Sequence, residues 1–340
     1  MNLPLNVRSE GDVKFMINLK MNGDKFKILN LSDIQLSNNE WKPGHCNREI
    51  VVNTVNTLIE KIRPDLITLS GDIAWADELE AYEKLADFID GFGIPWAPIW
   101  GNHDNQSGKE ITDIHVKTVT ARKNCIYERG PAELGNGNYV ITIERDGNPV
   151  SALIMMDSHD SRLPLPHEEG VDKIWDELLP GQFTWYREHV KKLRAMGYVS
   201  SAIIMHIPIY AYRDAFSAAS SGLEQTSVLP RNSYGSALWK EDYKDTFGVN
   251  YEEICSHPYD NGFFDLVLEL DHTKCIISGH DHINNSCINY KGVRLAYALK
   301  TGPGCYWDPI LNGGTVLTAD ADASMELHHE YVDAADFKRT

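Results

Sequence analysis

The segment IPWAPIWGNHD at residues 94–104 joins an apolar run to a cluster of polar side chains. The apolar part has the length and composition of a buried strand. It stops at Gly101, and an amide, an imidazole and a carboxylate follow in Asn102, His103 and Asp104. Because a lone GNHD is most often a hydrogen-bonded turn, its meaning depends on whether other strands end in the same way.

Other predicted strands also end in polar side chains. These strands span residues 26–32, 65–70, 201–205 and 274–278. The groups that follow them are Asp33, Gln35, Asp72, His206, His280 and His282. Helical spacing over 47–62 and 78–90 links the first strands of the chain, which predicts βαβ units and parallel pairing. Ligands of parallel sheets bind beyond the carboxyl ends of the strands, so we expect these side chains to converge on one rim.

The rest of the chain contains further elements and two segments without an assigned role. The pattern predicts a hairpin of strands 139–143 and 150–156, a helix over 181–195, and closing strands at 293–297 and 315–318. Segment 105–134 is mostly helical and charged, whereas 211–262 has no clear periodicity, and we expect both to shape specificity. No repeat or linker interrupts the sequence, which favours a single domain over 1–340 with the site motifs in 25–304.

The composition excludes several classes of partner. The formal net charge is −17, from 49 acidic and 32 basic residues, which opposes binding to a polyanion such as duplex DNA. No segment is apolar over a length that would cross a bilayer, and residues 1–25 lack the pattern of a signal peptide. The six cysteines form no CxxC pair, which favours a reducing compartment. We therefore expect a cytoplasmic protein with neither a nucleic-acid nor a membrane partner.

The side chains at the strand ends are suitable metal ligands. Imidazole and carboxylate groups bind zinc, iron and manganese, and a carboxylate can bridge two ions through its two oxygens. Two dications roughly 3.5–4 Å apart can hold a hydroxide between them and bind the oxygens of a phosphate. Because the field of bound dications can dominate the net charge nearby, a small phosphorylated substrate is compatible with the acidic composition.

The order of the motifs resembles that of a known superfamily. D-x-Q at 33–35, GD at 71–72, GNHD at 101–104, His206 after a strand and GHDH at 279–282 follow one another along the chain. This order resembles the calcineurin-like metallophosphoesterases, whose pattern is D-x-H, GD, GNH[D/E], H and GHxH. Stretches at 136–139, 182–186, 206–208 and 301–302 further resemble the compact purple-acid-phosphatase-like branch. The resemblance implies an α/β fold, a four-layer αββα sandwich of two mixed β-sheets flanked by helices.

The resemblance also implies a ligand set for two divalent or trivalent ions of manganese, iron or zinc. Asp72 would bridge the two ions. The first site would contain Asp33, Gln35 and His282, and the second would contain Asn102, His206 and His280. The implied catalytic residues are His103, which would stabilise the transition state or protonate the leaving oxygen, and Asp104, which would orient the His103 ring.

Some positions depart from the family pattern. Gln35 replaces a histidine, so its neutral amide is either a weaker ligand, with more preference for manganese, or a neighbour of the ligands. Trp75 stands where purple acid phosphatases place a ligating tyrosine, so no tyrosinate–iron colour is expected. Residues 73–77 also lack the Asp-Arg-Gly that follows GD in Ser/Thr protein phosphatases. A phosphoprotein is therefore not the expected substrate.

These features predict a metal-dependent phosphoric ester hydrolase. A hydroxide that bridges the metal ions would attack the phosphorus of a phosphate mono- or diester, while His103 assists the leaving group. Two alternatives remain. One is hydrolysis of the pyrophosphate bond of a nucleotide diphosphate, because the D-x-Q variant resembles manganese-dependent enzymes of that kind. The other is a non-catalytic, metal-stabilised interaction scaffold.

Overall fold

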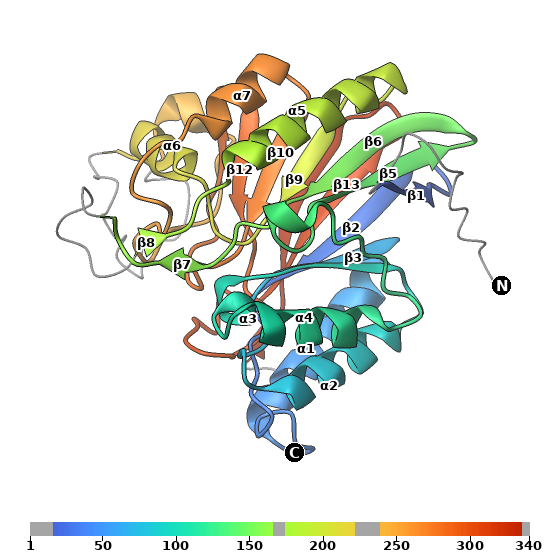
Figure 1. Ribbon diagram of the computed structural model, residues 1–340, viewed down its shortest axis with the longest axis vertical. Coiled ribbons are helices and arrows are strands. Elements are labelled where there is room, and N and C mark those ends of the chain that lie inside the picture. The colour runs from blue at the N-terminus through green and yellow to red at the C-terminus, as the bar shows by residue number, and fades with distance from the viewer. Residues whose placement is uncertain (1–15, 166–173, 222–238, 335–340) are drawn as a thin grey trace.

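The computed structural model describes residues 16–165, 174–221 and 239–334, which form two mixed β-sheets between two layers of helices (Figure 1). The seven-stranded sheet has the order β1 (Met16–Lys20), β5 (Tyr139–Arg145), β6 (Asn148–Met155), β9 (Ser201–Ile204), β10 (Thr273–Ser278), β12 (Val293–Tyr297) and β11 (Cys287–Tyr290). The five-stranded sheet has the order β14 (Met325–Tyr331), β13 (Gly313–Asp320), β2 (Lys25–Leu31), β3 (Leu66–Ser70) and β4 (Trp96–Ile99). The predicted four-layer αββα sandwich is confirmed.

Helices cover the outer face of each sheet (Figure 1). The five-stranded sheet is covered by α1 (Cys46–Ile62), α2 (Leu79–Asp90) and α4 (Lys109–Thr120), and the short α3 (Asn102–Asn105) follows β4. The seven-stranded sheet is covered by α5 (Pro180–Ala195), α6 (Ala211–Ala219) and α7 (Phe263–Leu270). A small sheet of β7 (Ser161–Arg162) and β8 (Ile174–Trp175) and the 3-10 turns Ala132–Leu134 and Glu241–Tyr243 complete the described elements.

Alternating side chains of the central strands enter different hydrophobic cores. In β2, Ile28 packs between the two sheets and Leu29 packs under the helices. In β10, Ile277 packs between the sheets and Ile276 packs under α5 and α7. Successive residues of a strand point to opposite faces, so a strand buried on both faces needs a continuous apolar run. This requirement explains why the sequence identified these strands.

The direction of the strands brings the functional loops to one end of the molecule. β2, β3 and β4 pair in parallel, as do β6, β9 and β10. α1 supports the first crossover and ends at Ile62, because the next residue, Arg63, has a φ of 51° and precedes Pro64. Loops that leave parallel strands at their carboxyl ends lie side by side, and these loops carry the predicted metal ligands.

Other segments differ from the sequence-based expectations. β1, β11 and β14 were not predicted, and antiparallel pairs make both sheets mixed. Only α4 and one 3-10 turn form in 105–134. Segment 211–262 contains α6, although 222–238 lies outside the described residues. None of the described helices has the length and hydropathy needed to span a membrane.

Candidate metal centre

The motifs from both sheets meet at the carboxyl ends of their strands. The five-stranded sheet contributes Asp33 and Gln35 after β2, Asp72 after β3 and Asn102 after β4. The seven-stranded sheet contributes His206 after β9, and His280 and His282 after β10. The exposed fractions of these side chains range from 0% to 7%. Such complete burial of polar groups requires hydrogen-bond partners or ions that compensate for the lost water.

Three of the four oxygen-bearing residues lie on turns with an unusual backbone conformation. Asp33, Gln35 and Asp72 have φ values of 54°, 46° and 47°, in the left-handed region that residues other than glycine rarely adopt. Hydrogen bonds from Asp33 N to Gly71 O (3.2 Å) and from Gln35 N to Asp72 O (3.1 Å) join the two turns. Such conformations cost about 1–3 kcal/mol each, and they cluster at functional sites.

The ring of His206 presents one nitrogen to two oxygen atoms. Its Nδ1 donates to the carbonyl oxygen of Ser70 (2.8 Å), which leaves Nε2 facing the centre. Nε2 lies 3.0 Å from Oδ1 of Asn102 and 3.4 Å from Oδ1 of Asp72. A neutral ring would place three lone pairs against one another at this point. In the side-chain orientation that the structure shows, a cation among these atoms, either a proton or a metal ion, would remove this repulsion.

His282 is held in the same way in the other part of the site. Its Nδ1 donates to the carbonyl oxygen of Tyr306 (2.9 Å), and its Nε2 lies 3.4 Å from Oδ1 of Asp33. Potential ligand atoms of Asp33, Asp72 and His282 all lie within 4.8 Å of one another. A carbonyl that fixes the outer nitrogen of an imidazole is the usual support for a metal-binding histidine.

Two further groups have no partner among the described residues. The amide nitrogen and oxygen of Gln35 and Nε2 of His280 are buried and form no hydrogen bond. A buried polar atom without a partner costs about 1–3 kcal/mol. The rings of His280 and His206 lie 5.2 Å apart, so both histidines belong to one cluster. Metal ions would satisfy the amide oxygen of Gln35 and Nε2 of His280, and these residues therefore fit a metal centre.

The electrostatic environment attracts positive charge. Burial alone would raise the pKa of Asp33, but the hydrogen bond and charge of His282 hold it well below its usual range. Burial opposes the charging of His206, yet the carboxylate of Asp72 raises its pKa to about 10. Burial and the charge of His206 lower the pKa of His280 to about 3. The ring of His280 therefore remains neutral at neutral pH and is free to act as a ligand.

Glycines of the motifs allow the loops to approach one another closely. A Cβ on Gly101 would collide with Oδ1 of Asp72, and one on Gly279 would collide with Ser32 and the carboxylate of Asp33. Each of these glycines therefore makes room for an acidic residue from a different motif. This packing gives a physical reason for the glycine that begins GNHD and GHDH.

The structure corrects the expected role of Asp104. Its buried carboxylate accepts hydrogen bonds from Gly101 N (2.7 Å), Ile73 N (3.1 Å) and the hydroxyl of Tyr82 (2.7 Å). The ring of His103 instead donates from Nδ1 to Oε1 of Gln106 (2.8 Å). Asp104 thus joins the loops after β3 and β4, because backbone N–H groups and a phenol surround it. Burial raises its pKa to about 7.

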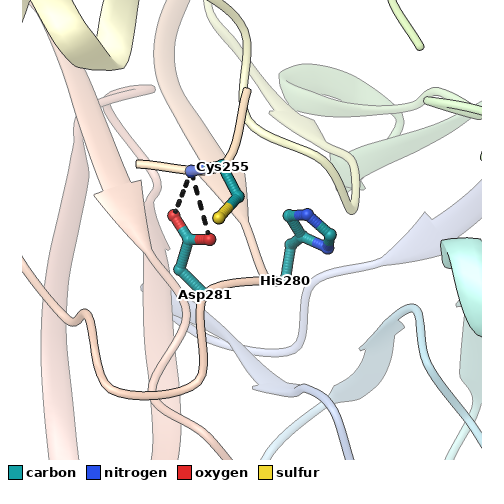
Figure 2. Close-up of side chains that lie close together, drawn as sticks. All are labelled: Cys255, His280 and Asp281. Atoms are coloured by element: carbon teal, nitrogen blue, oxygen red, sulfur yellow. Dashed lines mark hydrogen bonds between the residues drawn. The ribbon is translucent and has the colours of Figure 1, made fainter. Parts of the chain in front are cut away.

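Asp281 plays a similar role in the GHDH motif. Potential ligand atoms of Cys255, His280 and Asp281 lie within 4.8 Å of one another, and Figure 2 shows the Asp281 side chain directed at the backbone of Cys255. Its carboxylate accepts from Cys255 N (3.2 Å) and from the hydroxyl of Tyr297 (2.5 Å). Because its oxygens are occupied by these donors, Asp281 serves to anchor the loop that carries both histidines.

Lys300 is a charged residue of the site that the sequence patterns did not identify. Its side chain is 2% exposed, and its ammonium donates to the carbonyl oxygen of Asp33. Burial lowers its pKa, although the charges of Asp33 and Asp72 oppose that effect. A lysine next to Thr301 in a loop has no distinctive spacing, and only the tertiary fold brings it to Asp33.

Comparison with known proteins identifies relatives of this chain. The family model for the calcineurin-like phosphoesterases matches residues 26–284. A protein of Arabidopsis thaliana named probable inactive purple acid phosphatase 14 is 26% identical over 318 residues, which cover 82% of this chain and 71% of that protein. Phosphatase DCR2 of Saccharomyces cerevisiae is 25% identical over 296 residues, which cover 78% of this chain and 45% of that protein.

A solved structure has the same fold. A dimetal phosphatase from Danio rerio (LOC 393393) matches with a TM-score of 0.53 at 11% identity, covering 90% of this chain and 99% of that one. At this identity the likeness concerns the fold alone. The family match includes every motif from Asp33 to His282. The chain therefore belongs to the calcineurin-like phosphoesterase family.

Proposed function

We propose that the protein hydrolyses phosphate mono- or diesters with two metal ions of manganese, iron or zinc. The observation that carries this proposal is the meeting of buried carboxylate, amide and imidazole groups from two sheets without enough hydrogen-bond donors to satisfy them. Nε2 of His206 faces two oxygen atoms, and Nε2 of His280 has no partner among the described residues. Cations complete such a set, and imidazole and carboxylate ligands suit these three metals.

The distances favour a particular division of the ligands. Asp72 stands between the two groups, because its Oδ1 lies 3.4 Å from Nε2 of His206 and its ligand atoms also lie near those of Asp33 and His282. We assign Asp33, Gln35 and His282 to one ion, and Asn102, His206 and His280 to the other. Gln35 is included because its buried amide has no other partner among the described residues.

Two bound metal ions would supply Lewis acidity toward phosphate oxygens and would lower the pKa of water. The residues of the chain would orient the ester and manage its protons. The ring of His103 is half-buried and its Nδ1 is held by Gln106, so Nε2 is available to protonate the leaving oxygen. The backbone N–H of His103 donates to Oδ1 of Asp72 (2.9 Å), which ties this proton donor to the proposed bridging carboxylate.

A non-catalytic scaffold is a second candidate, because some relatives have names that describe them as inactive. The geometry favours catalysis over this alternative. His103 is not needed to hold the fold, since its ring contacts Gln106 and Trp75 at the edge of the site. A scaffold has no use for a half-exposed imidazole supported in this position.

The test is hydrolysis of p-nitrophenyl phosphate and bis-p-nitrophenyl phosphate by protein stripped of metal and reloaded with manganese, iron or zinc. Metal-dependent turnover that disappears in Asp72→Ala is expected, and the preferred ester distinguishes monoesterase from diesterase. A nucleotide diphosphate serves as a third substrate for the pyrophosphate alternative. Two bound ions without turnover on any of the three substrates would favour the scaffold.

The same proposal includes a cellular setting and a class of partner. A small phosphorylated molecule is compatible with the net charge of −17, because metal ions bound at the centre would supply the local positive charge that attracts a phosphate. Each of the six cysteines is a free thiol, which agrees with a reducing compartment such as the cytoplasm. Localisation of a tagged full chain by microscopy, with a cytoplasmic marker for comparison, tests this assignment.

A further inference from the structure

Aromatic rings contact three different histidines of the candidate centre. The ring of Trp75 meets His103 edge-on with a centroid distance of 4.6 Å, and Trp175 meets His280 in the same way at 4.3 Å. The ring of Tyr306 stacks on His282 at 4.2 Å, with an angle of 22° between the planes. We call Trp75, Trp175 and Tyr306 the aromatic rim.

The aromatic rim is assembled from segments far apart in the sequence. Trp75 follows β3, Trp175 lies in β8, and Tyr306 lies in the loop between β12 and β13. β8 and α3, which carries His103, lie at the same end of the two sheets (Figure 1). Each of the three segments thus places one aromatic ring against a different histidine of the same site. Such one-to-one placement is more specific evidence than a high number of aromatic residues near the site would be.

The rings are not fully enclosed by the protein. Tyr306 is 47% exposed, and Trp75 and Trp175 are half-buried. The rings of Tyr306 and Trp75 therefore each contact a histidine of the site and keep part of their surface in contact with solvent. By contrast, the buried histidines and acidic residues beneath are at most 7% exposed. The partly exposed rings therefore lie between the buried histidines and solvent.

Other apolar side chains are exposed in the same segments. Leu163 is 81% exposed and follows β7, whose Ser161 pairs with Trp175. Leu165 is 48% exposed, and Ile310, four residues after Tyr306, is 53% exposed. Large apolar side chains in exposed loops beside a candidate site are a typical feature of surfaces that bind an apolar group.

We propose that the aromatic rim binds the organic part of the substrate and selects phosphate esters that carry a planar aromatic group. This inference rests on the proposed function, because it assumes that the phosphate lies at the metal centre. A flat ring can stack on Tyr306 or lie against the indole ring of Trp75, whereas a saturated ring of similar size makes only apolar C–H contacts with these faces.

A structural role for the rim makes a different prediction. If the rings only supported the histidines, their removal would weaken metal binding and would affect all ligands equally. If they bind the substrate, their removal would leave the metal content unchanged and would lower the affinity for aromatic ligands alone. The two roles are therefore separated by measuring metal content and ligand selectivity on the same proteins.

The test compares phenylphosphonate with cyclohexylphosphonate. Both present a phosphonate to the metal ions, neither can be hydrolysed, and the rings differ mainly in planarity. Calorimetric titration of the full chain reloaded with metal should show about tenfold tighter binding of the phenyl compound. Elemental analysis of the same samples gives the number of bound ions.

Variants of Tyr306 provide matched controls. Tyr306→Phe keeps the ring but removes the hydroxyl that donates to Glu252, whereas Tyr306→Leu removes the ring. Neither change affects the backbone carbonyl that holds His282. We expect Tyr306→Phe to keep the preference for phenylphosphonate and Tyr306→Leu to reduce it about fivefold, with unchanged metal content. Tyr259→Leu removes an exposed ring outside the aromatic rim and should leave the preference unchanged.

Each result separates this inference from the proposed function. Equal binding of the two phosphonates to a fully loaded wild-type protein overturns the aromatic rim but leaves the phosphoesterase proposal intact. If Tyr306→Leu loses metal and binds both phosphonates more weakly to the same degree, the ring supports His282 and the proposed role of the aromatic rim is wrong. A preference for phenylphosphonate in a protein that turns over no ester keeps the aromatic rim and rejects the catalytic proposal.

Discussion

The two sheets contribute chemically different groups to the candidate centre. The five-stranded sheet presents oxygen atoms, on Asp33, Gln35, Asp72 and Asn102. The seven-stranded sheet presents imidazole nitrogens, on His206, His280 and His282. Oxygen ligands supply negative charge or a neutral dipole, whereas imidazoles supply softer, neutral ligands. The centre therefore forms only where the two sheets pack together.

The two groups also depend on each other for their orientation. His206 belongs to the seven-stranded side, but Ser70 at the end of β3 fixes its ring. Asp33 belongs to the five-stranded side, but the backbone N–H of His280 donates to its carboxylate (3.2 Å). Each side thus provides the outer contacts of the other. This reciprocity implies that a disturbance on one side also reaches ligands on the other.

Removal of the charge of Asp72 should have the largest effect. Asp72→Asn keeps the shape of the side chain but loses the charge that attracts cations to both groups of ligands. We expect the bound metal to fall below one ion per chain and turnover to fall by about a thousandfold or more. Elemental analysis and hydrolysis of p-nitrophenyl phosphate measure both quantities. Two retained ions with near wild-type turnover would remove Asp72 from the bridging position.

Loss of an imidazole should cost less than loss of the bridging charge. His206→Ala removes Nε2 from Asn102 and Asp72 but leaves Asp33, His282 and their contacts in place. We expect one of two ions to be lost and turnover to fall by about a hundredfold. Metal content and turnover should be measured beside those of Asp72→Asn. If both variants lost the same amount of metal and turnover, the prediction that the bridging carboxylate matters more than a single imidazole would be wrong.

The sequence was most informative where a functional residue follows a strand buried on both faces. Asp33, Asp72, Asn102, His206 and His280 all occupy such positions, and the apolar runs before them mark the end of each strand. Gln106 and Lys300 lack such a context. Lys300 reaches Asp33 through the packing of distant loops, which no local spacing encodes. Gln106 follows His103 by three residues, and the turn of α3 brings the two side chains together. The role of Asp104 was predicted wrongly because its carboxylate is directed toward Ile73 and Tyr82 and away from the ring of His103.

The same contrast applies to the elements. Continuous apolar runs predicted β2, β3, β9 and β10, whereas α6 was missed within a polar segment. Its buried residues are Ala211, Tyr212, Ala215, Phe216 and Ala219, which do have helical spacing. Three of them are alanines, which contribute little to a hydrophobic pattern even though they allow close packing. A periodicity search that counts alanine as apolar would have found this helix.

A histidine outside the candidate centre connects the two sheets, and its burial should make the free energy of unfolding depend on pH. Nδ1 of His329 in β14 lies 3.0 Å from Oγ1 of Thr315. Its Nε2 donates to the carbonyl oxygen of Asn285 (2.8 Å), a residue that follows the GHDH motif. Burial lowers its pKa from 6.5 to about 4. The native ring is therefore neutral at pH values where the unfolded chain is already protonated.

The sign of this effect follows from the lowered pKa. The stabilisation is complete above about pH 6.5 and is lost as the pH falls toward 4, at a total cost of about 3 kcal/mol. Urea unfolding of wild type and His329→Gln at several pH values measures it. The variant should lack this part of the pH dependence, since glutamine does not titrate. Parallel pH profiles for the two proteins would contradict the assignment.

The smallest effect should come from the contact that orients His103. Gln106 is exposed and lies outside the proposed ligand set, so Gln106→Ala should leave both metal ions in place. It removes the acceptor that holds Nδ1 of His103. If His103 protonates the leaving oxygen, this loss should lower kcat by about three- to tenfold for phenyl phosphate, whose leaving group needs a proton.

A better leaving group provides the internal control for this prediction. p-Nitrophenolate departs without protonation, so kcat for p-nitrophenyl phosphate should change by less than about twofold in Gln106→Ala. Gln106→Glu keeps an acceptor for Nδ1 and should restore turnover of phenyl phosphate. Equal losses with both esters would instead assign Gln106 to the general shape of the site. The ratio of the kcat values for the two esters therefore shows whether Gln106 orients His103 as a proton donor or only maintains the shape of the loop after β4.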